Sequence, residues 1–133
     1  MIAEDDVAAY LNTEEIGVLG NNLFTGPVRP VTQYVPANSL FVLGGGGSGA
    51  QRYLSGGAKV ENRHPSVQVS IRHLDYDDGK AKALEVHNAL QAAKITGYWD
   101  CKVDQSAPFY LGFQNDAYRW SVNCTLSERK EGW

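Results

Sequence analysis

Two stretches of this sequence alternate apolar and polar residues strictly, and this alternation constrains the fold more than any other feature. Residues 67–72 read Val-Gln-Val-Ser-Ile-Arg, and residues 118–126 place Tyr, Trp, Val, Cys and Leu at every second position. Successive side chains of a strand point to opposite faces of the sheet, so each stretch has one apolar and one polar face. Such strands are typical of a sheet that is covered on one face. Residues 99–104 alternate in the same way and predict a further strand.

An amphipathic helix is predicted between these strands. Residues 76–94 carry one apolar stripe at helical spacing, made of Ala83, Val86, Leu90 and Ala93. Asp75 stands where a helix N-cap is expected, and Gly97 is a stop signal. Leu84 lies off the stripe, so we expect it to be exposed or to face something other than the core.

The remaining segments complete one α+β domain. Residues 2–13 predict a short helix whose acidic first turn suits the helix dipole. Short strands are predicted near 23–25 and 40–43, and a short extended piece at 108–112. We therefore expect one mixed or antiparallel β-sheet with two helices packed on it. Residues 1–128 form this single domain in our prediction, and residues 129–133 form a polar C-terminal tail.

Residues 44–57 are half glycine and predict a flexible loop. Ordering so much glycine costs backbone entropy and buries few side chains. A phosphate-binding loop would require GxxxxGK[ST], but Ala50-Gln51-Arg52 follows Gly49, so nucleotide binding is disfavoured. Two readings stay open: a mobile loop, or a loop that becomes ordered on contact with a partner.

No residue pattern points to catalysis or to a metal. The three histidines, at 64, 73 and 87, are not spaced as metal ligands, and neither HExxH nor GxSxG is present. Cys101 and Cys124 form no CxxC motif and fall on apolar faces, so we expect small buried side chains. A disulfide between neighbouring strands stays possible, although no secretion signal supports it. We expect no enzyme activity, no cofactor and no metal.

The charge of the chain is mild overall but divided along the sequence. The net charge of −3 argues against generic nucleic-acid binding, and no apolar run is long enough for a membrane helix. The acidic N-terminus is unlike a secretory or mitochondrial leader, so we expect a cytosol-like compartment. Residues 1–28 carry five acids and no base, whereas residues 29–63 carry four bases and one acid. This division predicts either solvated faces or complementary surfaces between neighbouring copies.

Candidate interface residues follow from charge and residue type, because aromatic residues in loops either cover the local core or bind partners. The charged candidates are Asp5, Asp6, Arg29, Arg52, Lys59 and Arg63. The apolar and aromatic candidates are Tyr53, Leu84, Tyr110 and Phe113.

Two groups of residues resemble a known family. The first is Pro65-Ser66-Val67-Gln68-Val69, then Arg72, then Asp75-Tyr76-Asp77-Asp78-Gly79 at the start of the predicted helix. The second is Tyr110-Leu111-Gly112, followed by Arg119 and Asn123. Together they resemble the tail-terminator and minor capsid proteins of long-tailed bacteriophages. Many relatives place Arg-Asp after Tyr-Leu-Gly, where this chain has Phe113-Gln114.

The resemblance implies a structural virion protein of the phage neck. Such a protein forms a ring, usually of six copies, that caps the tail tube and joins the tail to the head-side connector. The implied partners are other copies of the chain, the tail tube protein and the connector protein, with genomic DNA passing through the lumen without specific binding and no membrane involved. Assembly in the host bacterial cytoplasm and a place in the virion are implied too. The alternatives are another neck or head-completion protein, or a small ligand-binding domain that uses the glycine-rich loop.

Overall fold

A computed structural model describes residues 3–44, 48–52, 60–91, 93–98, 100–114 and 116–131. The helices are α1 (Ala3–Thr13) and α2 (Tyr76–Leu90). The strands are β1 (Leu23–Thr25), β2 (Ser39–Gly44), β3 (Ser48–Arg52), β4 (Val60–His64), β5 (Ser66–His73), β6 (Asp100–Val103), β7 (Phe109–Gln114) and β8 (Ala117–Glu131).

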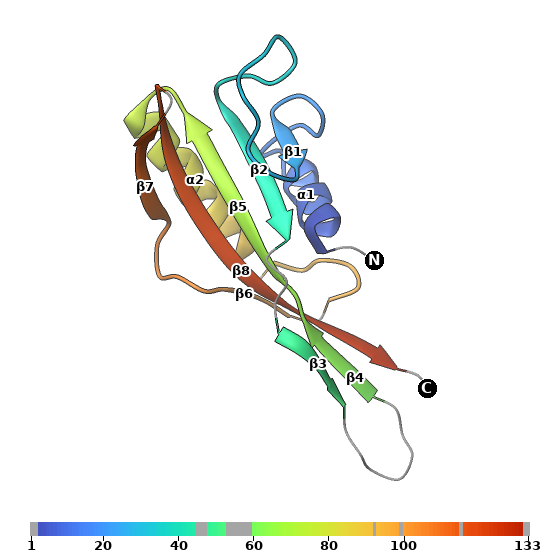
Figure 1. Ribbon diagram of the computed structural model, residues 1–133. Helices are drawn as coiled ribbons and strands as arrows, with labels where there is room; N and C mark the ends of the chain where they lie inside the picture. The colour runs from blue at the N-terminus through green and yellow to red at the C-terminus, as the bar shows by residue number, and fades with distance from the viewer. Residues whose placement is uncertain are drawn as a thin grey trace.

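The strands form one mixed sheet in which β8 is the central strand (Figure 1). The strand order is β1-β2-β5-β8-β4-β3, and β6 and β7 also pair with β8. The β1–β2 pair is parallel and every other pair is antiparallel. β4 and β5 pair in turn with one edge of β8, while β7 and β6 pair with the other. The predicted α+β class, with two helices on one mixed sheet, is confirmed.

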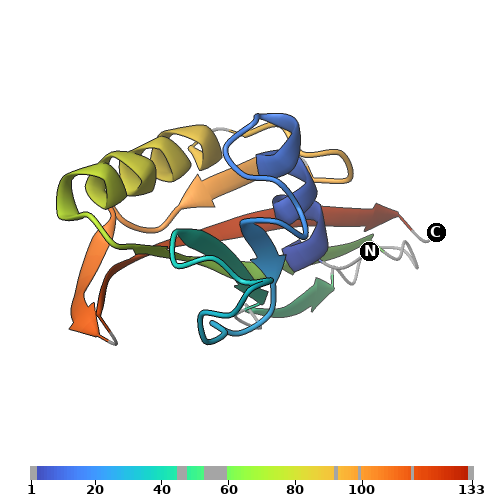
Figure 2. The ribbon, with the colours of Figure 1, turned by 90° about the horizontal axis from the view of Figure 1, so that it is seen from above.

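Both helices cover the same face of the sheet, as the alternating strands predicted (Figure 2). Val7 and Leu11 of α1 and Val86 of α2 are fully buried in the same core as Val69 of β5 and Val122 of β8. The apolar stripe of α2 therefore faces the sheet, and Leu84, off that stripe, is exposed.

The opposite face of the sheet is partly covered too, by the irregular segment 26–38. Phe24, Val35 and Phe41 form a second, smaller buried cluster there, with the two phenyl rings stacked at 5.7 Å. The sequence did not predict this packing against the sheet.

The last strand is longer than the sequence predicted. Its alternation suggested an end at residue 126 and a polar tail from 129, but β8 continues to Glu131 and pairs with β4. The register places residues of opposite charge across from one another, Glu61 opposite Lys130 and Arg63 opposite Glu128. Main-chain pairing with β4 therefore extends β8 beyond its alternating part.

The stretch predicted to be a flexible loop also differs in part from the prediction. Residues 48–52 form β3, which pairs with β4. Residues 45–47 and 53–57 of that stretch lie outside the described residues. Figure 1 shows β3, β4 and the C-terminal part of β8 as a ribbon that projects beyond the helix-covered body.

Candidate assembly surfaces

The start of α2 is built to sit close against β8. Asp75 caps the helix, because its Oδ2 accepts a hydrogen bond from Asp78 N at 3.1 Å. Gly79 follows in the first turn, where a Cβ atom would lie 2.3 Å from Cζ3 of Trp120. Only glycine therefore allows this approach, which explains the glycine in the Asp-Tyr-x-x-Gly pattern.

An aromatic cluster joins α2, β7 and β8 at this corner. The centroid of the Tyr76 ring lies 5.6 Å from the ring centroids of Tyr110 and Trp120, and 5.5 Å from that of Tyr118. Tyr110 is also 5.4 Å from Trp120. These separations fall in the range in which aromatic pairs attract beyond their area burial. The cluster therefore secures β7 to the body of the protein.

Strand β7 presents exposed apolar side chains along the edge of the sheet. We call this surface the β7 edge and define it as Phe109, Tyr110, Leu111 and Phe113. Phe109 is 59% exposed and Phe113 is 56% exposed, although Phe113 also contacts the Tyr118 ring at 4.9 Å. The pairing register shifts between Tyr110 and Gly112, and the φ of +108° at Gly112 suits glycine. A register shift of this kind locally bends a strand.

Further exposed apolar side chains lie in the segments on either side of β1, the strand at the other end of the sheet (Figure 1). We call this group the β1 edge and define it as Val18, Leu19, Val31 and Tyr34, which flank β1 in the chain. All four are exposed, and Tyr34 is 76% exposed. Neither these residues nor Phe109 were among the predicted interface residues, although apolar side chains between prolines and glycines were an available signal in the sequence.

Two of the predicted charged residues are used within the chain. Asp6 accepts a hydrogen bond from the Tyr98 hydroxyl at 2.7 Å, which holds α1 against the segment after α2. The Arg29 guanidinium lies over the Phe24 ring and donates to Thr25 O at 2.8 Å. Asp5 is exposed on α1. The structure therefore separates Asp5, which is available to a partner, from Asp6 and Arg29, which have partners in the fold.

The remaining predicted residues are distributed over several places. Arg52 ends β3 and Arg63 lies in β4, both on the projecting ribbon. Tyr53 and Lys59 lie outside the described residues. Leu84 is exposed on α2, whereas Tyr110 and Phe113 share the β7 edge. Of the candidates that the structure describes, Tyr110 and Phe113 share one strand, and Arg52 and Arg63 lie on the paired strands of the projecting ribbon.

Arg72 organises the covered part of the second face. Its guanidinium donates to Ala37 O at 3.1 Å, to Pro36 O at 3.0 Å, to Ser39 Oγ at 3.2 Å and to Arg29 O. It also lies over the Phe41 ring at 5.1 Å. Burial, and secondarily the nearby charge of Arg119, lower the pKa of Arg72 from its ordinary value. These bonds attach segment 26–38 to the sheet.

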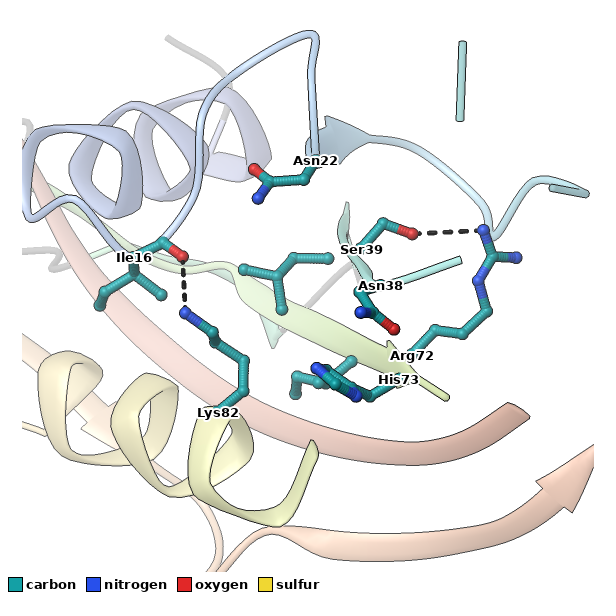
Figure 3. A pocket seen from close by; sticks show the side chains of 9 residues that line it. Ile16, Asn22, Asn38, Ser39, Arg72, His73 and Lys82 are labelled. Carbon is teal, nitrogen blue, oxygen red and sulfur yellow. Dashed lines mark hydrogen bonds between the residues drawn. The ribbon is translucent and has the colours of Figure 1, made fainter. Parts of the chain in front are cut away.

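The same end of the sheet contains a pocket of about 190 Å³ (Figure 3). The turn before β1, the start of β2, the end of β5 and Lys82 of α2 line it. Among the described residues no group of three or more His, Cys, Asp or Glu side chains could hold a metal ion. Neither described helix is long and apolar enough to cross a membrane.

Cys101 and Cys124 are both buried and free. They lie on paired strands, where Cys124 is opposite Val103. A hydrogen bond between the two thiols and burial raise the pKa of Cys124, so it stays protonated at neutral pH. The predicted small buried side chains are confirmed.

A family model agrees with the sequence resemblance. A family model described as bacteriophage tail terminator protein matches residues 10–127. No curated protein sequence matches the chain significantly. Among solved structures, a chain described as part of the virion of a native gene transfer agent particle is 14% identical, with a TM-score of 0.47 over 98% of this chain and 87% of that chain. With most of its length matched by the family model, this chain belongs to the bacteriophage tail terminator family, whose members are structural proteins of the virion.

Proposed function

We propose that this protein forms a ring that caps the tail tube and joins the tail to the head-side connector. The observation that carries the proposal is the pair of exposed apolar groups at the two ends of one sheet, the β7 edge and the β1 edge. A closed ring is built from head-to-tail contacts, which require two different surfaces on each subunit. One chain that presents such groups at both ends of its sheet is suited to this arrangement.

The β7 edge has the stronger character of an interface. Exposed aromatic side chains are enriched at protein contacts, and Phe109, Tyr110 and Phe113 lie within one short strand. As an edge strand it also offers main-chain groups to a partner. We place the β1 edge of the next copy against it, with Leu84 and Asp5 as further contacts in the assembly.

The projecting ribbon is our candidate for contact with the tail tube. It extends from the body (Figure 1) and includes Arg52 and Arg63, which the sequence analysis selected for their charge. In this proposal the protein works through its surfaces, without catalysis or cofactor. The ring, of six copies, assembles in the host cytoplasm, and genomic DNA passes through its lumen without specific binding.

Tube capping by edge variants tests the proposal. Phe109→Asp places a charge on the β7 edge and Tyr34→Asp places one on the β1 edge, while Asn88→Asp adds the same charge at an exposed position on α2. Each variant is mixed with tubes assembled from the tail tube protein of the same virus and imaged by negative-stain microscopy. We expect rings on tube ends with the wild type and Asn88→Asp, and bare ends with both edge variants.

Circular dichroism and thermal unfolding establish that each variant is folded before imaging. Capping by Phe109→Asp and Tyr34→Asp at wild-type levels would refute the assignment of the two edges. Wild-type protein that binds the isolated connector but never tube ends would place it elsewhere in the neck and refute the terminator role.

A further inference from the structure

The pocket at the end of the sheet is lined by apolar, neutral polar and basic side chains. Ile16, Leu40 and Ile71 form its apolar wall. Its polar side chains come from the turn before β1, from the start of β2, from the end of β5 and from α2: Asn22, Asn38, Ser39, Arg72, His73 and Lys82. The described residues that line the pocket include no Asp or Glu.

Main-chain contacts decide which atoms of the two asparagines remain available. Asn22 Oδ1 accepts from Val18 N at 2.7 Å, and Asn38 Oδ1 accepts from Leu74 N at 2.9 Å. The main-chain N–H group fixes the orientation of each amide, because only its oxygen can accept the hydrogen bond. Within the described part of the chain, neither Nδ2 atom donates a hydrogen bond. Two NH₂ groups are therefore left to donate to a ligand.

The basic side chains add donors and positive charge. His73 Nδ1 accepts from Asp75 N at 3.0 Å, so the neutral ring carries its proton on Nε2. Lys82 Nζ donates one of its three N–H groups to Ile16 O at 3.1 Å (Figure 3). Glu85 Oε2 lies 3.6 Å from the same nitrogen. The Arg72 guanidinium is turned toward Ser39 and the segment 26–38, so it contributes charge to this end of the sheet.

We propose that this pocket binds a carboxylate group. The oxygens of an ionised carboxylate only accept hydrogen bonds, and charge-assisted bonds from Lys are stronger than neutral ones. The apolar wall suits the short hydrocarbon stem that carries such a group in acetate or in an Asp or Glu side chain. The carboxylate comes from a free anion or from an acidic side chain of a second copy. The proposal does not depend on ring formation, because one chain supplies every lining residue.

Acetate binding to the monomer tests the proposal directly. Sodium acetate replaces sodium chloride at constant ionic strength and pH 7, while ¹⁵N–¹H spectra follow the side-chain NH₂ signals of Asn22 and Asn38. We expect saturable shifts of both signals. Lys82→Gln removes one positive charge from the pocket lining and should weaken binding about tenfold, since it loses a charge-assisted hydrogen bond. Lys80→Gln removes an exposed lysine on the same helix, outside the pocket, and should change the affinity less than about twofold.

A second variant keeps the test decisive if Lys82→Gln disturbs the contact with Ile16. Asn38→Asp retains the acceptor for Leu74 N but replaces the NH₂ donor with an anionic oxygen, so the Asn22 signal should no longer respond to acetate. Linear, unsaturated shifts in the wild type, or equal weakening by Lys80→Gln and Lys82→Gln, would overturn the proposal.

A dilution series in acetate-free buffer distinguishes the two sources. Concentration-dependent shifts at Asn22 and Asn38 identify an acidic side chain of another copy as the occupant, and constant shifts identify a free anion. Wild-type protein that binds acetate but does not cap tubes would count against the assembly proposal alone.

Discussion

The close approach of Gly79 to Trp120 yields the sharpest prediction about stability. In an exposed helix, replacing glycine with alanine stabilises the protein by about 1 kcal/mol, because alanine has the higher helix propensity. At Gly79 the added Cβ would lie 2.3 Å from Cζ3 and 2.6 Å from Cη2 of Trp120, and 2.8 Å from Cβ of His73. The sign of the effect should therefore be reversed.

The magnitude depends on whether the Trp120 ring can move away. Tyr76 at 5.6 Å and Tyr110 at 5.4 Å flank the ring, and Trp120 itself is only 3% exposed. Overpacking in such a confined site typically costs about 1–3 kcal/mol. Taking about 3 kcal/mol for the clash and subtracting about 1 kcal/mol of propensity leaves Gly79→Ala destabilised by about 2 kcal/mol. This corresponds to a Tm lowered by roughly 6 °C for a chain of this size.

Urea unfolding followed by circular dichroism measures this change without relying on tryptophan fluorescence. Ala81→Gly, at an exposed position of the same helix, is the control for propensity alone and should cost about 1 kcal/mol. Trp120→Phe removes the outer ring atoms, so the cost of Gly79→Ala should shrink by about 1 kcal/mol or more in that background. Gly79→Ala as stable as the wild type, or equally costly with Phe at 120, would refute the reasoning.

Two further predictions concern buried polar groups. Arg72→Met keeps the length of the side chain but leaves three carbonyl groups of residues 29–37 without their hydrogen-bond donor. It should therefore lower the free energy of unfolding by about 3 kcal/mol and expose this segment to limited proteolysis. Arg119→Met, which loses one exposed bond to Gln114, should cost under about 1 kcal/mol, and equal effects of the two would contradict the role of Arg72. Cys101 and Cys124 should resist alkylation by iodoacetamide at pH 8 until urea unfolds the chain, because both are buried and the pKa of Cys124 is raised. Mass spectrometry measures the labelling, and rapid labelling of the native protein would be inconsistent with that burial.

The sequence carried enough local information to predict the core face of the sheet. Strict alternation assigned Val69 and Val122 to one face, and helical spacing assigned Val86 to the surface that covers them. These assignments were correct because the hydrophobic period depends only on neighbouring residues. The N-cap at Asp75 was predictable for the same reason, since the acceptor and the N–H it binds lie three residues apart.

Features that depend on distant partners could not be predicted in this way. Residues 127–131 are polar and have no apolar alternation, yet they belong to β8, whose residues 128–131 pair with the distant strand β4. Alternation placed Arg72 on the polar face correctly, but its burial follows from segment 26–38, whose prolines give no periodic signal. Asp6 was selected as an interface residue for its charge, and its hydroxyl partner Tyr98 lies beyond α2 in the chain.

The residues that carry the family resemblance explain how the proposed interface is presented. Asp75 starts α2, Gly79 lets the helix approach Trp120, and Tyr76 and Tyr110 pack around the same ring. Gly112 then bends β7 just beyond this cluster. These positions set where the β7 edge lies, whereas Phe109 and Phe113 supply its most exposed side chains. The family pattern thus specifies the position of the proposed assembly surface, and in that proposal residues outside the pattern determine which partner surface it fits.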